Sequence, residues 1–343
     1  MLKVAFLGDM MLANGVGRAI EKHGPEYVWG DTLRVLKKAD LRISNLECPV
    51  SDKGSPWSGQ KKMFLFRAPP SAIGALSAGG VDCVSLANNH TLDYGREALL
   101  DTMKRLDGAG IAHAGAGKDI DEATRPALLE ARGAKISFVA AGDNMPAWEA
   151  FGEKAGVNHI TLSRYSMLRQ WAGALFSWGR VREKIGRTLL QSRARSDIAV
   201  FSAHLGPNWI KSPDWTVVRF AKEAMAQGAD IFHGHSAHIF QGIRFWGGKP
   251  ILHDTGDFID DYPDYAGMDN DLSFIFIVEI DETEKKAKRL ILTPIKIARC
   301  QAKLARGADA EKTCKKMQSL CAAMGTESVT DEGVLKIRIP QPG

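Results

Sequence analysis

The chain has 343 residues, of which 45% are hydrophobic, enough for one large domain or two modest ones with a sizeable core. This composition excludes a disordered chain and a fibrous repeat. The formal charge of +5 comes from 45 Lys and Arg residues against 40 Asp and Glu residues. That excess is too small to indicate a nucleic-acid partner, and we expect none.

The N-terminus lacks the features of a secretory signal, because the chain reaches a carboxylate at Asp9 before any long apolar stretch. No later stretch approaches the roughly 18 apolar residues of a membrane span. The five cysteines are an odd number and include no Cys-x-x-Cys pair, which argues against a disulfide framework or a thiolate zinc site. We therefore expect a soluble, cytoplasmic protein without an integral membrane segment.

Short apolar runs rich in Val, Ile and Phe alternate with helical patterns along the chain, which is typical of an α/β domain with helices packed over sheets. The expected strands are Lys3–Gly8, Leu41–Leu46, Val81–Ala87, Lys135–Ala140, Asp197–Ala203, Asp230–Gly234, Pro250–His253, Leu272–Ile280 and Leu290–Ile297. The expected helices are Ser71–Ala78, Arg96–Ala109, Asp214–Gln227 and Ala310–Met324. The last helix ends before Gly325, as a C-terminal cap requires.

Residues 161–195 form a basic segment that we expect to be helical. It contains a single acid, Glu183, and two tryptophans, Trp171 and Trp178. The simpler interpretation is a solvated helical face with the tryptophans packed beneath it. The alternative is a basic wall beside an active site that attracts an anionic substrate. The basic residues are Arg164, Arg169, Arg180, Arg182, Lys184, Arg187, Arg193 and Arg195.

Polar side chains follow the expected strands repeatedly, at the points where the strands end. In open α/β sheets, ligands bind beyond the carboxyl ends of the strands, where loops converge over a rigid sheet. Each residue alone is weak evidence, since turns, caps and structural histidines are common, but their combination at five strand ends indicates one site. The residues are Asp9, Glu47, Asn89 with His90, His204, and the pair His235 and His238.

This set mixes carboxylate and amide oxygens with neutral imidazoles, which suits zinc, manganese or iron better than calcium. No Gly-x-Ser-x-Gly elbow and no phosphate-binding P-loop is present to suggest a different chemistry. The sequence therefore predicts a site for divalent metal ions.

The ordered motifs resemble the CapA family of capsule and poly-γ-glutamate biosynthesis proteins, within the calcineurin-like metallophosphoesterase superfamily. The resemblance extends from Leu2 to about Gly325. It implies a four-layer α/β/β/α sandwich of two packed mixed sheets flanked by helices. The catalytic domain would cover residues 1–300, and residues 301–343 would add a helix and strand extension packed on it. The motifs are Gly8-Asp9-Met10-Met11, Asn45-Leu46-Glu47, Ala87-Asn88-Asn89-His90 with Asp93 and Gly95, His204-Leu205-Gly206, Gly234-His235-Ser236-Ala237-His238 with Gln241, and Gly248-Lys249-Pro250-Ile251 leading to Gly256-Asp257-Phe258.

The resemblance also implies roles at a centre of two divalent ions. Glu47 would bridge them, with Asp9 on the first ion and Asn89 and His204 on the second. His235 and His238 would each serve one ion, with the assignment open because the superfamily usually spaces this pair one residue apart. His90, together with Asn89, would be catalytic, with His90 acting as a general acid or stabilising developing charge.

Two departures from the superfamily pattern bear on this site. Met11 stands where many metallophosphoesterases have a histidine, so the first metal site lacks one ligand. Glu47 replaces the more common aspartate, which is characteristic of the CapA-like branch and weakens the inference of ordinary phosphodiesterase activity.

Two further residues are candidates for contact with the substrate. Arg67 would meet a carboxylate or phosphate, with a surface salt bridge as the alternative. Asp257, with Asp260 and Asp261 near it, would contact substrate or orient imidazoles, and the alternative is a solvated acidic loop.

The expected reaction is hydrolysis of an anionic polymer or peptide-like substrate such as poly-γ-glutamate, or of a phosphate ester. A water held between two cations has its pKa lowered from about 15.7 to about 7, which supplies a hydroxide for attack. Two alternatives stay open. The same site supports a metal-dependent peptide epimerase, and a chain with a purely structural site would be a non-catalytic capsule assembly factor.

Overall fold

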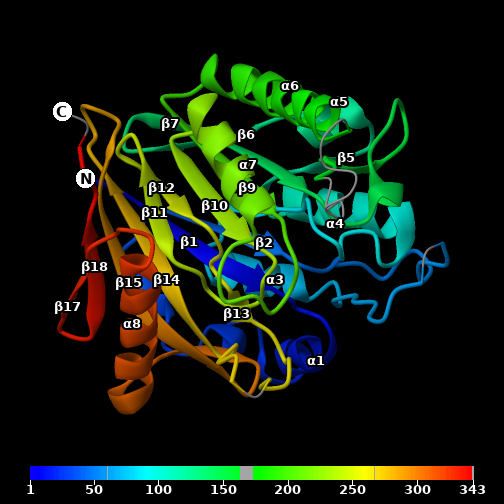
Figure 1. Ribbon diagram of the computed structural model, residues 1–343. Helices are drawn as coiled ribbons and strands as arrows, with labels where there is room; N and C mark the ends of the chain where they lie inside the picture. Colours follow the sequence, from blue (N-terminus) through cyan, green and yellow to red (C-terminus); the bar gives the residue numbers. More distant parts are fainter. Residues whose placement is uncertain (60, 163–172, 266, 342–343) are drawn as a thin grey trace.

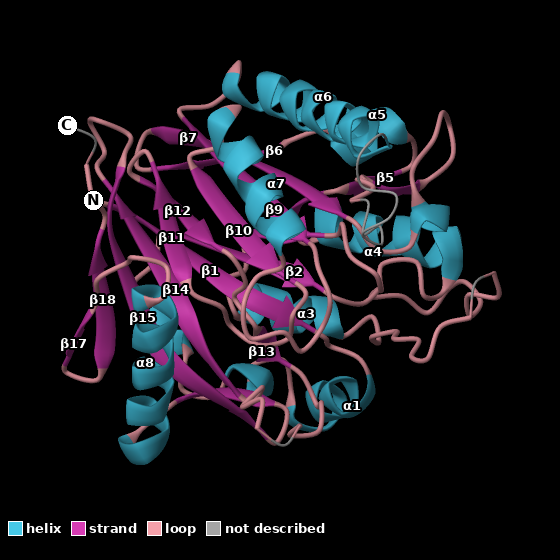
Figure 2. Ribbon diagram, viewed as in Figure 1, coloured by secondary structure: helices cyan, strands magenta, loops and turns pink. Residues whose placement is uncertain are grey.

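The computed structural model describes residues 1–59, 61–162, 173–265 and 267–341, with the backbone alone for 173–177. Two large sheets pack face to face, and helices cover both outer faces (Figure 1). Figure 2 shows the strands of both sheets at the centre with helices outside them. The predicted four-layer α/β/β/α architecture is confirmed.

The larger sheet has ten strands and is mixed. Strands β1 to β4 are parallel neighbours, and β14 and β15 extend the sheet in antiparallel fashion on the other side of β1. Strand β13 pairs with β1 in parallel, while β16 and β18 both pair with β15. The strands are β1 (Leu2–Met10), β2 (Leu41–Leu46), β3 (Cys83–Ser85), β4 (Ala112–Ala114), β13 (Asp257–Ile259), β14 (Leu272–Ile280), β15 (Ala287–Ala298), β16 (Gln301–Leu304), β17 (Val329–Asp331) and β18 (Val334–Arg338).

The second sheet has six strands in the order β11-β12-β10-β9-β7-β6. Its four central strands are parallel, and the two edge strands, β6 and β11, are antiparallel to their neighbours. The strands are β6 (Ala127–Ala131), β7 (Ala134–Gly142), β9 (Ile198–His204), β10 (Ile231–His235), β11 (Ile243–Trp246) and β12 (Lys249–Leu252). A two-stranded sheet joins β5 (Ala116–Gly117) to β8 (Gly156–Val157).

The alternation of side chains in β1 explains why both faces of the ten-stranded sheet are covered. Val4 and Phe6 lie in the apolar core between the two sheets, whereas Ala5 and Leu7 lie in the core beneath the outer helices. A strand with apolar residues on both faces is stable only when both faces are buried. Helices α1 (Asn14–His23), α2 (Leu33–Leu36), α3 (Ala72–Ala78) and α4 (Gly95–Gly108) cover this outer face.

Helices α6 (Gly173–Arg193) and α7 (Trp215–Ala226) cover the outer face of the six-stranded sheet. Helix α8 (Gly307–Ala322) packs against β11, β14 and β15 and places Met317 in the core between the sheets. The short elements are the 3-10 helices η1 (Tyr27–Trp29) and η2 (Pro146–Trp148) and helix α5 (Ile120–Thr124). The chain after residue 300 thus joins the same sheet and core as the rest of the protein. The division into a catalytic domain (residues 1–300) and an extension (residues 301–343) stays a prediction.

Every predicted strand and helix has a counterpart in the structure, although the predicted Val81–Ala87 strand is reduced to β3. Helix α1 and short strands such as β4, β6 and β13 were not predicted from the sequence. Helix α1 begins without a capping side chain, and short edge strands lack enough residues for a periodic pattern. Among the described helices, none has the length and apolar character to span a bilayer.

The basic segment contains α6, and three of its described arginines, Arg182, Arg187 and Arg193, contact carboxylates. Arg182 contacts Glu223, and Arg193 contacts Asp230. The Arg219 guanidinium lies 3.8 Å from the centroid of the Trp178 ring. Residues 163–172, including Arg164, Arg169 and Trp171, lie outside the described part of the chain.

Candidate metal centre

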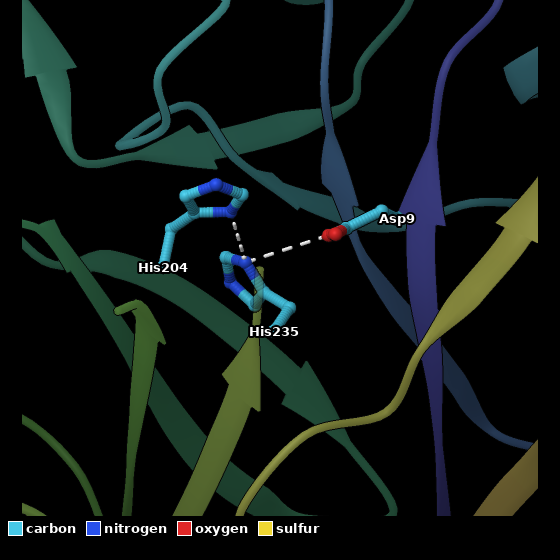
Figure 3. Close-up of side chains that lie close together, drawn as sticks. All are labelled: Asp9, His204 and His235. Carbon is cyan, nitrogen blue, oxygen red and sulfur yellow. Dashed lines mark hydrogen bonds and ion pairs between the residues drawn. The ribbon is translucent and has the colours of Figure 1, made fainter. Parts of the chain in front are cut away.

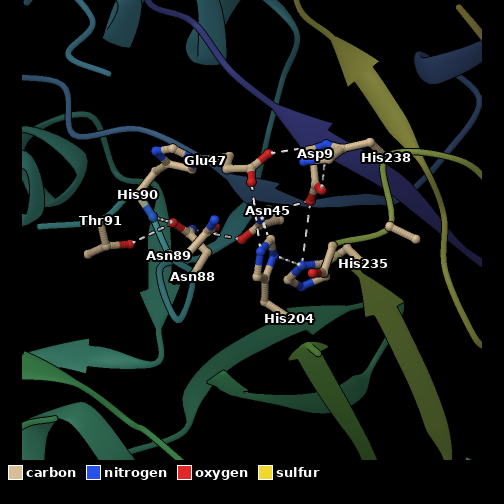
Figure 4. Close-up of polar contacts among 12 residues, drawn as sticks. Asp9, Asn45, Glu47, Asn88, Asn89, His90, Thr91, His204, His235 and His238 are labelled. Carbon is tan, nitrogen blue, oxygen red and sulfur yellow. Dashed lines mark hydrogen bonds and ion pairs between the residues drawn. The ribbon is translucent and has the colours of Figure 1, made fainter. Parts of the chain in front are cut away.

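The carboxyl ends of parallel strands from both sheets converge on one buried group of polar side chains (Figure 4). In the ten-stranded sheet, the register of β1 places Asp9 opposite Asn45 of β2 and opposite Asp257 of β13. In the six-stranded sheet, β9 and β10 place His204 opposite His235. These pairings bring residues that are distant in sequence to the same edge of each sheet.

Two glycines allow the strands to approach neighbouring loops closely at this edge. A Cβ atom at Gly8 would lie 1.9 Å from the carbonyl oxygen of Gly256, and one at Gly234 would lie 1.9 Å from that of His253. No side chain fits at either position. The glycines that precede Asp9 and His235 are therefore required by backbone packing.

Asp9, His204 and His235 form the first group of potential metal ligands (Figure 3), and one ligand atom from each lies within 4.8 Å of the others. The Nδ1 atom of His235 lies 3.5 Å from Asp9 Oδ1 and 2.9 Å from His204 Nδ1. All three side chains are buried. This geometry directs one carboxylate oxygen and two imidazoles at a common point.

Asp9, Glu47, His238 and Asp257 form the second group, also within 4.8 Å of one another. His238 Nδ1 lies 2.8 Å from Asp257 Oδ1 and 3.9 Å from both Asp9 Oδ2 and Glu47 Oε2. The other oxygen of Glu47 lies 3.7 Å from His204 Nε2. Asp9 is thus common to both groups, and Glu47 lies beside a histidine of each. His235 belongs to the first group and His238 to the second.

Burial controls the protonation of these ligands. Desolvation raises the pKa of Asp9 to about 6 and raises that of Glu47 well above its usual value, with repulsion from Asp9 contributing for Glu47. Desolvation also holds the pKa values of His204 and His235 well below the ordinary range. Both imidazoles are therefore neutral at pH 7, the form that binds metal ions.

Within the described part of the chain, several buried oxygens of this site lack the hydrogen-bond donor or cation that would stabilise them. Among the described residues, six buried side-chain oxygens around it have no hydrogen-bond donor. An unpaired buried polar atom costs free energy, so such groups normally find a partner. These oxygens, next to neutral imidazoles, fit divalent cations chemically. They are Asp9 Oδ2, both oxygens of Glu47, Asn89 Oδ1, Asp257 Oδ2 and Asp260 Oδ2.

His90 lies beside this centre and is held by two charged residues. Its Nδ1 lies 2.6 Å from Asp93 Oδ2 and 3.1 Å from the ammonium of Lys62, which also contacts Asp93. The ring of Phe66 packs on the imidazole with a centroid separation of 4.3 Å. Desolvation lowers the pKa of His90 to about 4, so the imidazole is neutral at pH 7. With the Nδ1 proton directed to Asp93, Nε2 is the acceptor.

Three polar residues orient the candidate ligands without belonging to either group. The Asn45 amide donates to Asp9 Oδ1 at 2.8 Å, and Ser202 Oγ lies 2.9 Å from His235 Nε2. Asp254 accepts a hydrogen bond from the backbone N–H of Ala237 at 2.7 Å, in the loop that runs from His235 to His238. Metal ligands usually depend on such supporting hydrogen bonds for their orientation.

Comparison with known proteins identifies the family. The sequence profile described as "Bacterial capsule synthesis protein PGA_cap" matches residues 3–262. The chain belongs to this bacterial capsule synthesis family. A probable polyglutamine synthesis accessory protein of Mycobacterium tuberculosis is 30% identical over 314 residues, which cover 89% of this chain and 79% of the relative.

More distant relatives carry capsule names. The capsule biosynthesis protein CapA of Bacillus anthracis is 24% identical over 76% of this chain and 60% of its own length. The PGA biosynthesis protein CapA of Bacillus subtilis is 22% identical over 76% of this chain and 63% of its own length. Among solved structures, the Haemophilus influenzae NAD nucleotidase is 13% identical with a TM-score of 0.40, over 93% of this chain and 56% of that one.

Within this capsule synthesis family member, the remaining predicted site residues take different places. Asn89 lies beside His90 (Figure 4). Its side-chain oxygen is buried, and its backbone carbonyl accepts a hydrogen bond from Lys62. Met11 is buried, and its sulfur accepts the N–H of Ala13 at 3.3 Å. The Met11 sulfur thus has a hydrogen-bond partner within its own loop.

Arg67 lies apart from both groups of potential ligands. Its guanidinium stacks 4.2 Å from the centroid of the Tyr94 ring. It lines a cavity of about 390 Å³ together with Arg18, and none of the candidate metal ligands lines that cavity. Among the described residues, no carboxylate lies within 4 Å of Arg67, so the alternative interpretation, a surface salt bridge, is not observed there.

Three residues near the centre, Lys62, Asp254 and Trp209, were not predicted from the sequence. The Trp209 ring packs against the His238 ring with a centroid separation of 5.0 Å. The backbone N–H of Trp209 donates to the carbonyl oxygen of Ala237 at 3.0 Å, and Trp209 has the unusual φ of 63°. Lys62 and Trp209 lie in loops without periodic patterns, so no sequence feature singled them out. Asp254 follows a predicted strand as the other site residues do, and that position was the available clue.

Proposed function

We propose that this protein is a metal-dependent hydrolase whose site binds two divalent cations. The observation that carries the proposal is Glu47, which is fully buried with both carboxylate oxygens lacking a donor among the described residues. A buried, unpaired carboxylate is strongly unfavourable. Two cations beside Glu47 and Asp9 would remove that cost, and the neutral imidazoles nearby would complete their coordination.

The residues divide into ligands and a proton acceptor. Asp9, His204 and His235 would hold one ion, and Glu47, His238 and Asp257 the other, with Asn89 Oδ1 as an additional ligand. Zinc, manganese and iron suit this set of donors. When bound, such ions would lower the pKa of water and polarise the carbonyl or phosphoryl oxygen of the group under attack.

His90 would act at the reacting bond. Asp93 fixes its Nδ1 proton, so the imidazole is neutral with a bare Nε2 at pH 7. In that state His90 accepts a proton rather than donating one. We therefore assign it first as a general base, in contrast to the general-acid role that the resemblance implies.

The substrate we propose is an anionic polymer or peptide-like chain, such as poly-γ-glutamate, or a phosphate ester. The family description and the names of its relatives concern capsule and polyglutamine synthesis. Arg67 and Arg18 would bind a carboxylate or phosphate further along such a chain, since neither is paired with a carboxylate among the described residues. A guanidinium matches both anions geometrically.

Metal content and turnover of Glu47→Gln test the proposal. The variant keeps the shape of the side chain and removes its charge. Metal analysis should give about two ions per wild-type chain and a clear loss in the variant. Hydrolysis of an aryl phosphate and of poly-γ-glutamate should fall by at least about 100-fold. The exposed Glu97→Gln serves as the control and should change neither. Wild-type metal content in Glu47→Gln would contradict the assignment.

Two other functions are compatible with the same site. The M. tuberculosis relative is named an accessory protein, which favours a non-catalytic role in polymer assembly. Metal binding without turnover of any polymer or phosphate substrate would support that role. The neutral His90 also suits proton removal from an α-carbon in an epimerase. Deuterium uptake from heavy water without bond cleavage would identify that reaction.

A further inference from the structure

The segment between β2 and α3 forms a long projection beside the candidate metal centre. Its base is closed by pairing of Val50 with Ala68, and Ser51 donates its N–H to the Ala68 carbonyl at 3.1 Å. Figure 1 shows this segment, in blue, extending away from the sheets on the right of the view. Because this segment extends beyond the sheets, contacts at its base and inner part must hold it in place.

The outer part of this projection exposes two adjacent large apolar side chains. Met63 is 86% exposed and Phe64 is 56% exposed. Among the described residues, they are the only consecutive pair of exposed large hydrophobic residues. Lys61 beside them is exposed and has no ion-pair partner within the described part of the chain. We call Lys61, Met63 and Phe64 the apolar tip.

Contacts at the inner part of the projection hold it firmly over His90. The backbone N–H groups of Trp57 and Phe66 bond to the carbonyl and carboxylate of Asp93 at 2.8 and 2.7 Å. Lys62 contacts the same carboxylate, and its ammonium lies 4.8 Å from the centroid of the Trp148 ring. The position of the apolar tip is therefore fixed relative to the catalytic candidate.

We propose that the apolar tip docks into the interface of a lipid bilayer that contains anionic lipids. Met63 and Phe64 would enter the boundary between headgroups and acyl chains, and Lys61 would face the lipid phosphates. Interfacial binding of this kind combines a few buried apolar groups with basic residues near the negative surface. Docking in this way brings the candidate metal centre to the membrane surface.

The size of the apolar tip favours a bilayer over a protein partner. A stable protein interface buries about 800 Å² on each partner. Two neighbouring side chains and a lysine supply far less than that area. A bilayer interface has no such requirement, because each apolar side chain that enters it adds its own transfer free energy.

Vesicle co-sedimentation tests this proposal. The wild-type chain should sediment with vesicles of phosphatidylcholine and phosphatidylglycerol, and added salt should weaken the binding. The double variant Met63→Ser, Phe64→Ser should lower the partition coefficient at least about tenfold. The matched control, Phe151→Ser with Leu190→Ser, removes side chains that are 80% and 74% exposed elsewhere, and it should bind like the wild type.

A second variant separates the roles of charge and apolar insertion. Lys61→Glu should weaken binding to vesicles with phosphatidylglycerol and leave binding to pure phosphatidylcholine unchanged. Thermal melting of each variant at the wild-type temperature shows that the fold is intact. Equal sedimentation of the wild type and the Met63/Phe64 double variant would overturn the proposal. So would a change in the elution volume of that variant without loss of vesicle binding, which indicates a protein interface.

Discussion

The two sheets contribute chemically different halves to the candidate metal centre. The ten-stranded sheet supplies the carboxylates of Asp9, Glu47 and Asp257, from β1, the end of β2, and β13. The six-stranded sheet supplies imidazoles, with His204 and His235 at the ends of β9 and β10 and His238 in the following loop. Figure 4 shows the labelled carboxylates and imidazoles facing one another.

This difference shows where the need for a cation arises. On the carboxylate side, the oxygens repel one another and several have no donor among the described residues. On the imidazole side, burial keeps the His204 and His235 rings neutral, and His235 already has Ser202 as a partner. Neutral ligands add affinity for metal without adding repulsion. The carboxylate half thus provides the charge and the imidazole half the coordination.

His90 offers the strongest test of this division, because it is an imidazole that comes from the ten-stranded side, after β3. Its position against Asp93 and Lys62 leads us to expect a role in proton transfer rather than in binding metal. His90→Gln should lower kcat by about 100-fold to 10,000-fold and leave the metal content unchanged. The exposed His23→Gln is the control. Loss of both metal and activity would place His90 among the ligands. It would contradict the division in which the ten-stranded sheet supplies carboxylates and the six-stranded sheet supplies the imidazole ligands.

The carboxylate half predicts a pH dependence in the metal-free protein. Burial raises the pKa of Asp260 to about 7, from an ordinary value near 4. Between these values the folded state retains a proton that the unfolded chain releases, so stability falls as the pH rises from about 4 to about 7. Asp260→Asn removes the ionisable group and with it this pH-dependent loss of stability, and the amide keeps an oxygen that accepts the backbone N–H of Tyr262.

Thermal or urea unfolding of chelator-treated protein measures this effect. The variant should match the wild type near pH 4 and exceed it in stability above about pH 7, by at most about 4 kcal/mol. If the free energies of unfolding of the variant and the wild type differ by the same amount across this pH range, ionisation of buried Asp260 does not destabilise the metal-free protein.

On the imidazole half, Ser202→Ala should give the smallest of these effects. Its hydroxyl lies 2.9 Å from His235 Nε2 and orients the ring so that Nδ1 faces Asp9. Loss of such a supporting contact weakens metal binding about 10-fold to 100-fold, which a competing chelator dye measures. Ser137→Ala, in strand β7 away from the site, is the matched control. Equal affinities for Ser202→Ala and the wild type would show that the ring needs no such support.

Much of this site could be anticipated from the positions where expected strands end. The rule that ligands collect at the carboxyl ends of strands selected Asp9, Glu47, His204 and His235 before any geometry was available. It also selected Asn89 with His90. The same rule gave no information about Lys62, because that lysine lies in an irregular loop and reaches Asp93 through contacts distant in sequence.

The sequence by itself determined most of the elements and the types of residue at the strand ends, because side-chain periodicity and turn chemistry act over a few residues. Its resemblance to a known family implied the four-layer architecture. Only the tertiary structure decided which atoms face each other. The register of β1 with β13 makes Asp257 a neighbour of Asp9, and the packing of one sheet on the other brings Glu47 within 3.7 Å of His204. Distances between sheets depend on the whole core, which no local pattern encodes.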